Sequence, residues 1–340
     1  MAKIVLGMGC AHTPQLHTKA EDWALRGNRD KIDGVPFWYK GKRMKYAEVE
    51  AMRKSEGFAP NLDLDYGNQL LQRAYKVLDR MHEAYRAAKP DVMILFGNDQ
   101  HEIFFNQLNP AFAILGGESF DNMPRTDVQK TRLPVGIALA DPGHLPDEHV
   151  SLPGHPELAE HLTRSLVAED FDITASTEQP RVEEDKSVMD GMPHAYGFIY
   201  KQIMRDFVIP HVPIVTNTFF PPNQPKASRC LAFGRAVGRA IEAWDSDARV
   251  CVVGSGGLSH FLVDADWDNE FLEGLKANQL DELASLDEAY YQAGSSECKS
   301  WLAAAGAVEG TGLKPHVEDY FPLFRTEGGT GSSCGFLTWS

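Results

Sequence analysis

The chain has 340 residues, of which 43% are apolar and 24% are charged, and its formal net charge is −15. These proportions are ordinary for a globular protein, and the negative charge argues against a surface that binds nucleic acid or anionic membranes. No apolar run approaches the roughly 18 residues that span a bilayer, and no signal peptide is evident, so we expect a soluble cytoplasmic protein.

Strand-like and helical segments alternate along the chain. The strand-like runs lie, in order, at 3–9, 91–97, 111–115, 171–175, 212–217 and 249–254. The helical patterns lie at 66–88, 155–168, 193–205, 227–243, 268–284 and 295–305, and apolar residues recur most clearly at three- to four-residue spacing in the first. This alternation predicts an α/β fold with a central, largely parallel or mixed sheet flanked by helices on both faces.

Two segments interrupt the alternation. Residues 17–65 form a long polar and aromatic excursion, and residues 116–153 are punctuated by Pro and Gly, as in a surface loop. A long insert in a compact domain is usually functional or disordered, and the aromatic density of 17–65 argues against disorder. We therefore expect one catalytic domain over 1–340, with 17–65 as a lid-like insert. The five scattered cysteines contain no CxxC pair and predict reduced thiols.

Three of the strand-like runs are each followed by a histidine. His12 follows the first run, His101 follows the run at 91–97, and His260 ends the run that passes through Gly254-Ser-Gly-Gly-Leu-Ser. Open α/β sheets bind ligands in the crevice beyond the carboxyl ends of their strands. The three histidines therefore indicate one shared site, and the residue type indicates a metal.

Each position also has a plainer interpretation. His12 could be bonded to backbone at a strand end, and the polar run at 98–102 could be a solvated loop. The glycines before His260 permit a close approach to a ligand, but they lack the Lys and the spacing of a phosphate-binding P-loop. His194 lies at a predicted helix start, where the helix dipole disfavours protonation.

Two histidines and a carboxylate with open positions would make the facial triad of a non-heme Fe(II) oxygenase. Glu297 is a candidate for the carboxylate, because it lies in the first turn of the helix predicted at 295–305. Taken alone, it is better explained as a helix-start acid that the dipole stabilises.

The motifs together resemble the class III, LigB-type extradiol ring-cleavage dioxygenases, such as the large subunit of protocatechuate 4,5-dioxygenase and the gallate and methylgallate dioxygenases. The resemblance covers most of the chain outside 17–65. It rests on the order and spacing of six features: His12-Thr-Pro14, Asn98-Asp99 with a following His, the His194 helix start, Pro221-Pro222 with Arg229-Cys230, Gly256-Gly-Leu-Ser-His260, and Glu297 four residues before Trp301.

The resemblance implies that His12, His101 and Glu297 bind Fe(II) and that His260 is the catalytic acid/base. It implies that His194 either supports the ligands from behind or faces the substrate. In the protocatechuate enzyme the ligand His directly follows Asn-Asp, whereas Gln100 intervenes here. A one-residue shift turns a side chain to the opposite face of a strand, and a small bulge would restore it. The second ligand is therefore either His101 or a neighbour.

The implied reaction is extradiol cleavage of a catechol by O2. Basic residues beside Trp23, Phe37, Trp38 and Tyr39 suggest that 17–65 covers a lignin-derived aromatic acid such as protocatechuate, gallate or 3-O-methylgallate; these are Lys19, Arg26, Arg29, Lys31, Lys40, Lys42, Arg43 and Lys45. The alternative is a solvated basic stretch. We expect a homodimer, and the competing functions are a metal-dependent hydrolase and a non-enzymatic binding protein of the same fold.

Overall fold

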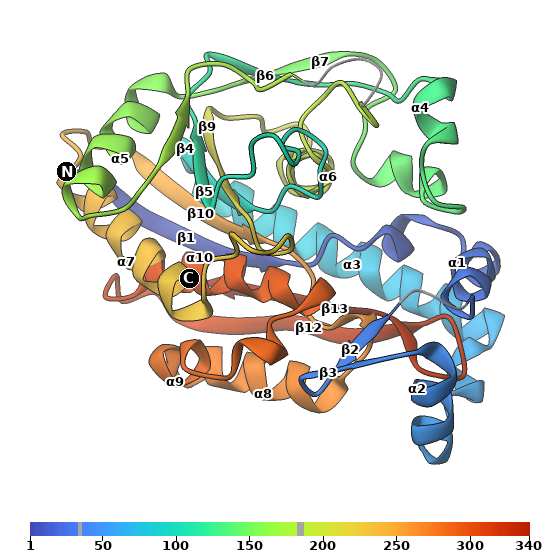
Figure 1. The fold of residues 1–340 in the computed structure, drawn as a ribbon. Coiled ribbons are helices and arrows are strands. Elements are labelled where there is room, and N and C mark those ends of the chain that lie inside the picture. Colours follow the sequence, from blue (N-terminus) through green and yellow to red (C-terminus); the bar gives the residue numbers. More distant parts are fainter. Residues whose placement is uncertain (33–35, 182–186) are drawn as a thin grey trace.

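The computed structural model describes residues 1–32, 36–181 and 187–340, so part of the predicted insert, 33–35, lies outside the described residues. A nine-stranded sheet forms the centre of these residues (Figure 1). Its strands are β1 (Lys3–Cys10), β4 (Val92–Gly97), β5 (Phe112–Leu115), β8 (Thr174–Ser176), β9 (His211–Thr216), β10 (Arg249–Ser255), β11 (His260–Leu262), β12 (Pro315–Phe324) and β13 (Thr330–Trp339).

The strand order is β11-β13-β1-β10-β4-β9-β5-β8, and β12 pairs with β13. The neighbours β1, β10, β4 and β9 are mutually parallel, whereas β13 pairs antiparallel with β1 and β5 pairs antiparallel with β9. The carboxyl ends of β1, β10 and β4 therefore lie side by side at one edge of the sheet. This is the edge at which the sequence predicts the site.

Alternation along the central strands divides the core into one cluster on each face of the sheet. In β4, Val92, Ile94 and Phe96 join one cluster, whereas Met93 and Leu95 join the other. The first cluster is covered by α5 (Pro156–Ala168), α7 (Ala227–Ala243), α8 (Ala265–Lys276) and α10 (Cys298–Val308). The second is covered by α3 (Leu64–Ala88) and α6 (His194–Ile199). The predicted mixed sheet with helices on both faces is confirmed.

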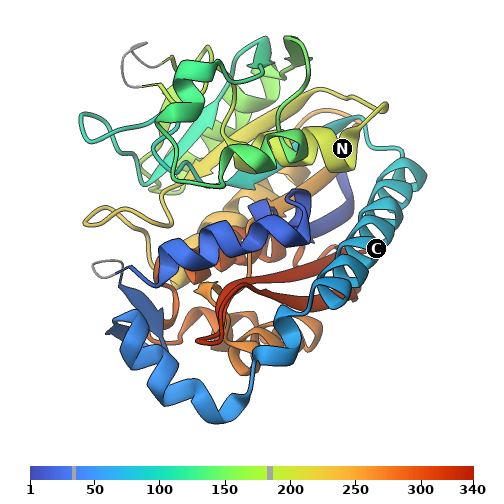
Figure 2. The same cartoon turned by 90° about the vertical axis from the view of Figure 1, so that its right-hand side faces the viewer.

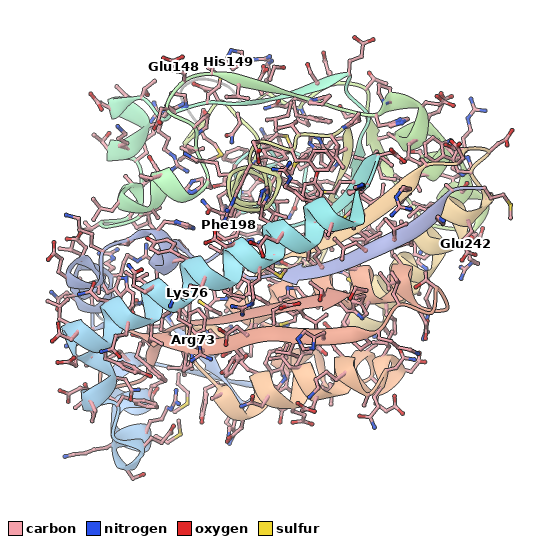
Figure 3. All side chains as sticks on the ribbon, turned by 180° about the vertical axis from the view of Figure 1, so that it is seen from behind. Arg73, Lys76, Glu148, His149, Phe198 and Glu242 are labelled. Atoms are coloured by element: carbon pink, nitrogen blue, oxygen red, sulfur yellow. The ribbon has the colours of Figure 1, made fainter. Side chains whose placement is uncertain are left out.

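Helix α3 crosses the face opposite to α7 and α10, as the view from behind shows (Figure 3). The carboxylate of Asp63 caps its first turn by accepting from the backbone N–H of Tyr66 at 2.9 Å. On its outer side, the Arg73 guanidinium donates to the Asp319 carboxylate, which fixes α3 to strand β12.

The sequence did not predict strands β11, β12 and β13. Strand β13, Thr-Gly-Ser-Ser-Cys-Gly-Phe-Leu-Thr-Trp, is rich in small residues and lacks the alternation of a half-buried strand, because all ten residues are buried. Two predicted helices are also interrupted. The segment 193–205 passes from α6 into a π-helical turn (Tyr200–Met204), and 268–284 divides into α8 and α9 (Leu280–Ala284), with Asn278 between them at φ 55°.

Most of the 17–65 insert has secondary structure. It contains α1 (Trp23–Asp30), the hairpin β2 (Phe37–Tyr39) and β3 (Lys42–Met44), and α2 (Tyr46–Arg53). The hairpin and α2 pack their apolar side chains against Leu262 of β11. Figure 2 shows α1, in dark blue, between the green segment that contains α4 (Asp127–Thr131) and the red strands β12 and β13. A two-stranded ribbon, β6 (Ser119–Asn122) and β7 (Val150–Pro153), adds structure to the predicted 116–153 loop.

In the described parts of the chain, no helix has both the length and the apolar character needed to span a membrane. The five cysteines are buried and unpaired.

Candidate active site

His12 lies two residues beyond β1 and is held by the neighbouring strand. Its Nδ1 lies 2.9 Å from the Ser255 hydroxyl at the end of β10, and that hydroxyl donates to the carbonyl of Ala195 at 2.6 Å. Because the Ser255 proton is committed to Ala195, Nδ1 of His12 must be the donor and Nε2 keeps a lone pair. Burial lowers the pKa of His12, and this effect outweighs the opposing effect of Glu297. The lowered pKa favours the neutral form of His12.

His260 is oriented by the backbone of its own loop. Its Nδ1 lies 3.0 Å from the carbonyl oxygen of Leu258, which can only accept, so Nδ1 carries a proton and donates it. Nε2 lies 3.7 Å from Oε1 of Glu297. The loop before His260 is tied to α8, because the Asp268 carboxylate accepts from the backbone N–H and the hydroxyl of Ser259, both at 2.7 Å.

Glu297 stands just ahead of α10 and is 1% exposed. Its carboxylate accepts from the backbone N–H of Gly257 at 2.7 Å and from the amides of Asn98 and Gln100 at 2.9 and 2.8 Å. Burial raises the pKa of Glu297, but the adjacent His12 and His260 lower it by a larger amount. The pKa of Glu297 therefore lies well below its ordinary value. The carboxylate is therefore ionised.

The glycines at 256 and 257 permit this arrangement. A Cβ on Gly256 would lie 2.8 Å from Cβ of Glu297, and a Cβ on Gly257 would lie 2.7 Å from Nδ1 of His260. The close approach that the sequence predicted at this motif is thus an approach to two site side chains rather than to a phosphate.

The turn after β4 presents Gln100, not His101, to Glu297. His101 has φ 58°, and its ring stacks on Phe220 with centroids 3.4 Å apart. Among the described residues, no hydrogen bond, ion pair or ring contact joins His101 to His12, His260 or Glu297, although His101 lines the same cavity and its Nε2 is buried without a hydrogen-bond partner. The one-residue offset seen in the sequence is therefore present in the structure.

His194 begins α6 and packs edge-on against His12, with ring centroids 4.8 Å apart. Its Nδ1 lies 2.8 Å from the Glu102 carboxylate, which also accepts from the His194 backbone N–H at 2.9 Å. Burial lowers the pKa of His194, but Glu102 raises it more, so the pKa lies above its ordinary value. The expectation that the helix dipole keeps His194 neutral is wrong, because a buried carboxylate outweighs the end of a six-residue helix. The sequence analysis missed Glu102, although it belongs to the polar run at 98–102.

These side chains open into a cavity of about 390 Å³, a size suited to a small ligand. His12, Gln100, His194, His260 and Glu297 line it together with Trp23, Phe198 and Phe261. Of the eight basic residues predicted to cover the substrate, only Arg26 lines this cavity within the described residues.

The donor types fit a divalent transition metal. Nε2 of His12 has no hydrogen-bond partner and lies 3.3 Å from Oε2 of Glu297, so a lone pair faces an ionised carboxylate, an arrangement that a cation would stabilise. No group of three His, Cys, Asp or Glu side chains in the described ranges is already arranged to hold a metal ion.

The chain is similar to known aromatic ring-opening dioxygenases. The family model described as the catalytic LigB subunit of aromatic ring-opening dioxygenase matches residues 63–336. Gallate dioxygenase from Pseudomonas putida is 26% identical over 198 residues, and the match covers 54% of this chain and 54% of that enzyme, about half of its length.

Longer matches are found with 2,3-dihydroxyphenylpropionate/2,3-dihydroxicinnamic acid 1,2-dioxygenases. The Comamonas testosteroni enzyme is 25% identical over 292 residues, covering 68% of this chain and 80% of that one. The Xanthobacter autotrophicus enzyme is 24% identical over 323 residues, covering 78% and 92%. Among solved structures, an uncharacterized Escherichia coli K12 protein, JW3007, aligns with a TM-score of 0.43 and 16% identity, over 76% of this chain and 91% of that chain.

Proposed function

The chain belongs to the LigB family of catalytic subunits of aromatic ring-opening dioxygenases, and from this membership we propose that it performs Fe(II)-dependent extradiol cleavage of a catecholic aromatic acid. The observation that carries the proposal is the meeting of His12, His260 and Glu297 in one cavity, where Nε2 of each histidine lies within 3.7 Å of a carboxylate oxygen of Glu297. Bound Fe(II) would supply the Lewis-acid and redox chemistry that joins a catechol to O2.

We propose His12 and Glu297 as two of the iron ligands. The turn at 98–101 would supply the third, and the geometry favours the carbonyl oxygen of Gln100, because its amide already lies beside Glu297. Rotation of this amide would exchange its nitrogen for its oxygen. His101, the ligand expected from the family resemblance, remains the competing candidate, and it would have to leave its stack on Phe220.

His260 is proposed as the acid/base. Its Nδ1–H is held by the Leu258 carbonyl, which leaves Nε2 to take a proton from a substrate hydroxyl and to return it later. His194 is proposed to remain protonated, because it is paired with Glu102, and to hold positive charge at the cavity wall beside the substrate oxygens.

The proposed substrate is a single-ring acid such as protocatechuate, gallate or 3-O-methylgallate. The relatives named above act on gallate and on dihydroxyphenylpropionate, which are both catecholic acids. The aromatic side chains in the cavity would pack against the ring. The lid role of 17–65, the cytoplasmic location, the homodimer and a part in lignin breakdown remain predictions.

Oxygen uptake tests the function directly. The purified protein would be loaded with Fe(II) under anaerobic conditions and then exposed to O2 with protocatechuate, gallate, 3-O-methylgallate or catechol. We expect stoichiometric O2 consumption and the absorbance of a ring-opened product with at least one of them. Metal-dependent ester or amide hydrolysis without O2 uptake would favour the hydrolase, and catechol binding without turnover would favour the binding protein.

A further inference from the structure

Among the described residues that line the cavity, one arginine has a buried nitrogen without a hydrogen-bond partner. Four arginines line it: Arg26, Arg125, Arg132 and Arg325. Arg125 pairs with Asp141, Arg132 donates to the carbonyl of Ser187, and Arg325 pairs with Asp30 at 2.5 Å. Nη1 of Arg26 is buried and has no hydrogen-bond partner among the described residues.

The insert holds Arg26 in place. Helix α1, which carries it, is fixed on one side by the Trp23 indole N–H, which lies 3.2 and 3.0 Å from the carbonyls of Gln15 and Thr18. Gly27 lies directly on the backbone after β12, because a Cβ there would approach the Arg325 carbonyl oxygen to 2.3 Å. From the 116–153 segment, Gly136 contacts the aliphatic stem of Arg26, and a Cβ built on it would lie 3.3 Å from Cγ and Cδ.

The charges around Arg26 would favour the binding of an anion beside its guanidinium. Burial, followed by the nearby Arg325, lowers the pKa of Arg26 to about 10, so the guanidinium is still protonated at neutral pH. Asp30 is the acid near Arg26, but Nε and Nη2 of Arg325 already occupy it. A partly buried cation without a hydrogen-bonded counter-ion is costly unless a ligand supplies one.

We propose that Arg26 is the carboxylate anchor of the substrate site: it binds the carboxylate of an aromatic acid whose ring occupies the cavity containing His12, His260 and Glu297. This inference rests on the proposed function and names the residue that selects acids over neutral catechols. The guanidinium fork matches a carboxylate in shape and charge. The other seven basic residues that the sequence predicts beside the substrate do not line this cavity in the described part of the chain.

Binding of matched acid and neutral ligands tests the anchor. Arg26→Met keeps most of the stem and removes the charge, and Arg29→Met changes an exposed Arg on the same helix as a control. Calorimetry would measure benzoate and benzamide binding to the metal-free proteins, and anaerobic 3,4-dihydroxybenzoate and catechol binding to the iron-loaded proteins. Melting curves and circular dichroism would check that each variant folds.

We expect Arg26→Met to weaken the two acids by about 10- to 100-fold, the range for a charge-assisted hydrogen bond, and to leave benzamide and catechol within about 3-fold. Arg29→Met should bind all four ligands like the wild type. If Arg26→Met weakened the binding of acids and of neutral ligands equally, the role of Arg26 would be structural. If benzoate bound Arg26→Met as tightly as the wild type, the guanidinium would contact only water in this cavity. Either result overturns the anchor.

The two proposals fail separately. If the iron-loaded wild type cleaves catechol and 3,4-dihydroxybenzoate with the same KM, Arg26 does not read the carboxylate, and ring cleavage stands. If no catechol is cleaved but benzoate binding depends on Arg26, the acid site stands and the ring-cleavage proposal fails.

Discussion

Nε2 of His12 lies 3.3 Å from Oε2 of Glu297, although Nδ1 of the same ring already carries the proton. Two acceptors that face each other in a buried site repel unless a proton or a metal lies between them. The Ser255 hydroxyl, itself committed to Ala195, is what prevents the ring from changing tautomer. The contact between His12 and Glu297 therefore predicts that this pair binds a metal ion.

The first prediction concerns metal affinity. In Glu297→Gln or His12→Ala, Fe(II) should no longer raise the melting temperature, because one ligand is lost. For the wild type, saturation at 100 times Kd should add about 2.7 kcal/mol to the free energy of unfolding. Scanning calorimetry with and without Fe(II) would measure this. An Fe(II)-dependent stabilisation of Glu297→Gln equal to that of the wild type would exclude Glu297 as a ligand.

The second prediction separates Gln100 from His101. Gln100→Ala should weaken Fe(II) binding by about 10- to 100-fold, the usual range for losing a residue that contacts or orients a metal site. His101→Ala should bind Fe(II) normally, because His101 stacks on Phe220 instead of facing Glu297. Competition with a chromogenic chelator would give both affinities. The opposite pattern would restore His101 as the ligand.

The third prediction concerns His260. His260→Ala should retain iron but lose about a hundredfold or more in kcat, the scale expected when general acid/base help is removed. Metal analysis and O2 uptake on the same sample would establish both points. If iron is lost together with activity, His260 is a ligand; if turnover is ordinary, it has no part in the reaction.

The fourth prediction is a pH dependence of stability. Burial raises the pKa of Asp268 to about 6 from an ordinary value of 3.8, despite bonds from Ser259 and Tyr320. The folded state therefore holds this proton more tightly than the unfolded chain does, so the contribution of Asp268 to stability falls as pH rises from about 4 to about 6. A difference of roughly two pKa units corresponds to about 3 kcal/mol.

Asp268→Asn should flatten this slope, as urea denaturation at pH 4, 5, 6 and 7 would show. Asp266→Asn, which changes an exposed neighbour in α8, should retain the wild-type slope. If Asp268→Asn and the wild type lose stability in parallel over this range, another group is responsible.

The sequence by itself determined the α/β class and the edge at which the site forms. The position of the site follows from apolar runs that are followed by His12 or by the polar run at 98–102, because parallel strands in a sheet bring their carboxyl ends to one side. The order of motifs also identified the family, which the match over 63–336 confirms. These features are local in the chain, so one sequence is enough to read them.

Tertiary structure decided the features that depend on residues far apart in sequence. The carboxylate of Glu102 raises the pKa of His194 from 92 positions away, and Arg325 occupies Asp30 from 295 positions away, which leaves Nη1 of Arg26 without a hydrogen-bond partner among the described residues. Strand β13 was not predicted because it is buried along its whole length and has no alternation. The choice between Gln100 and His101 depends on one turn, since a shift of a single residue reverses the direction of a side chain.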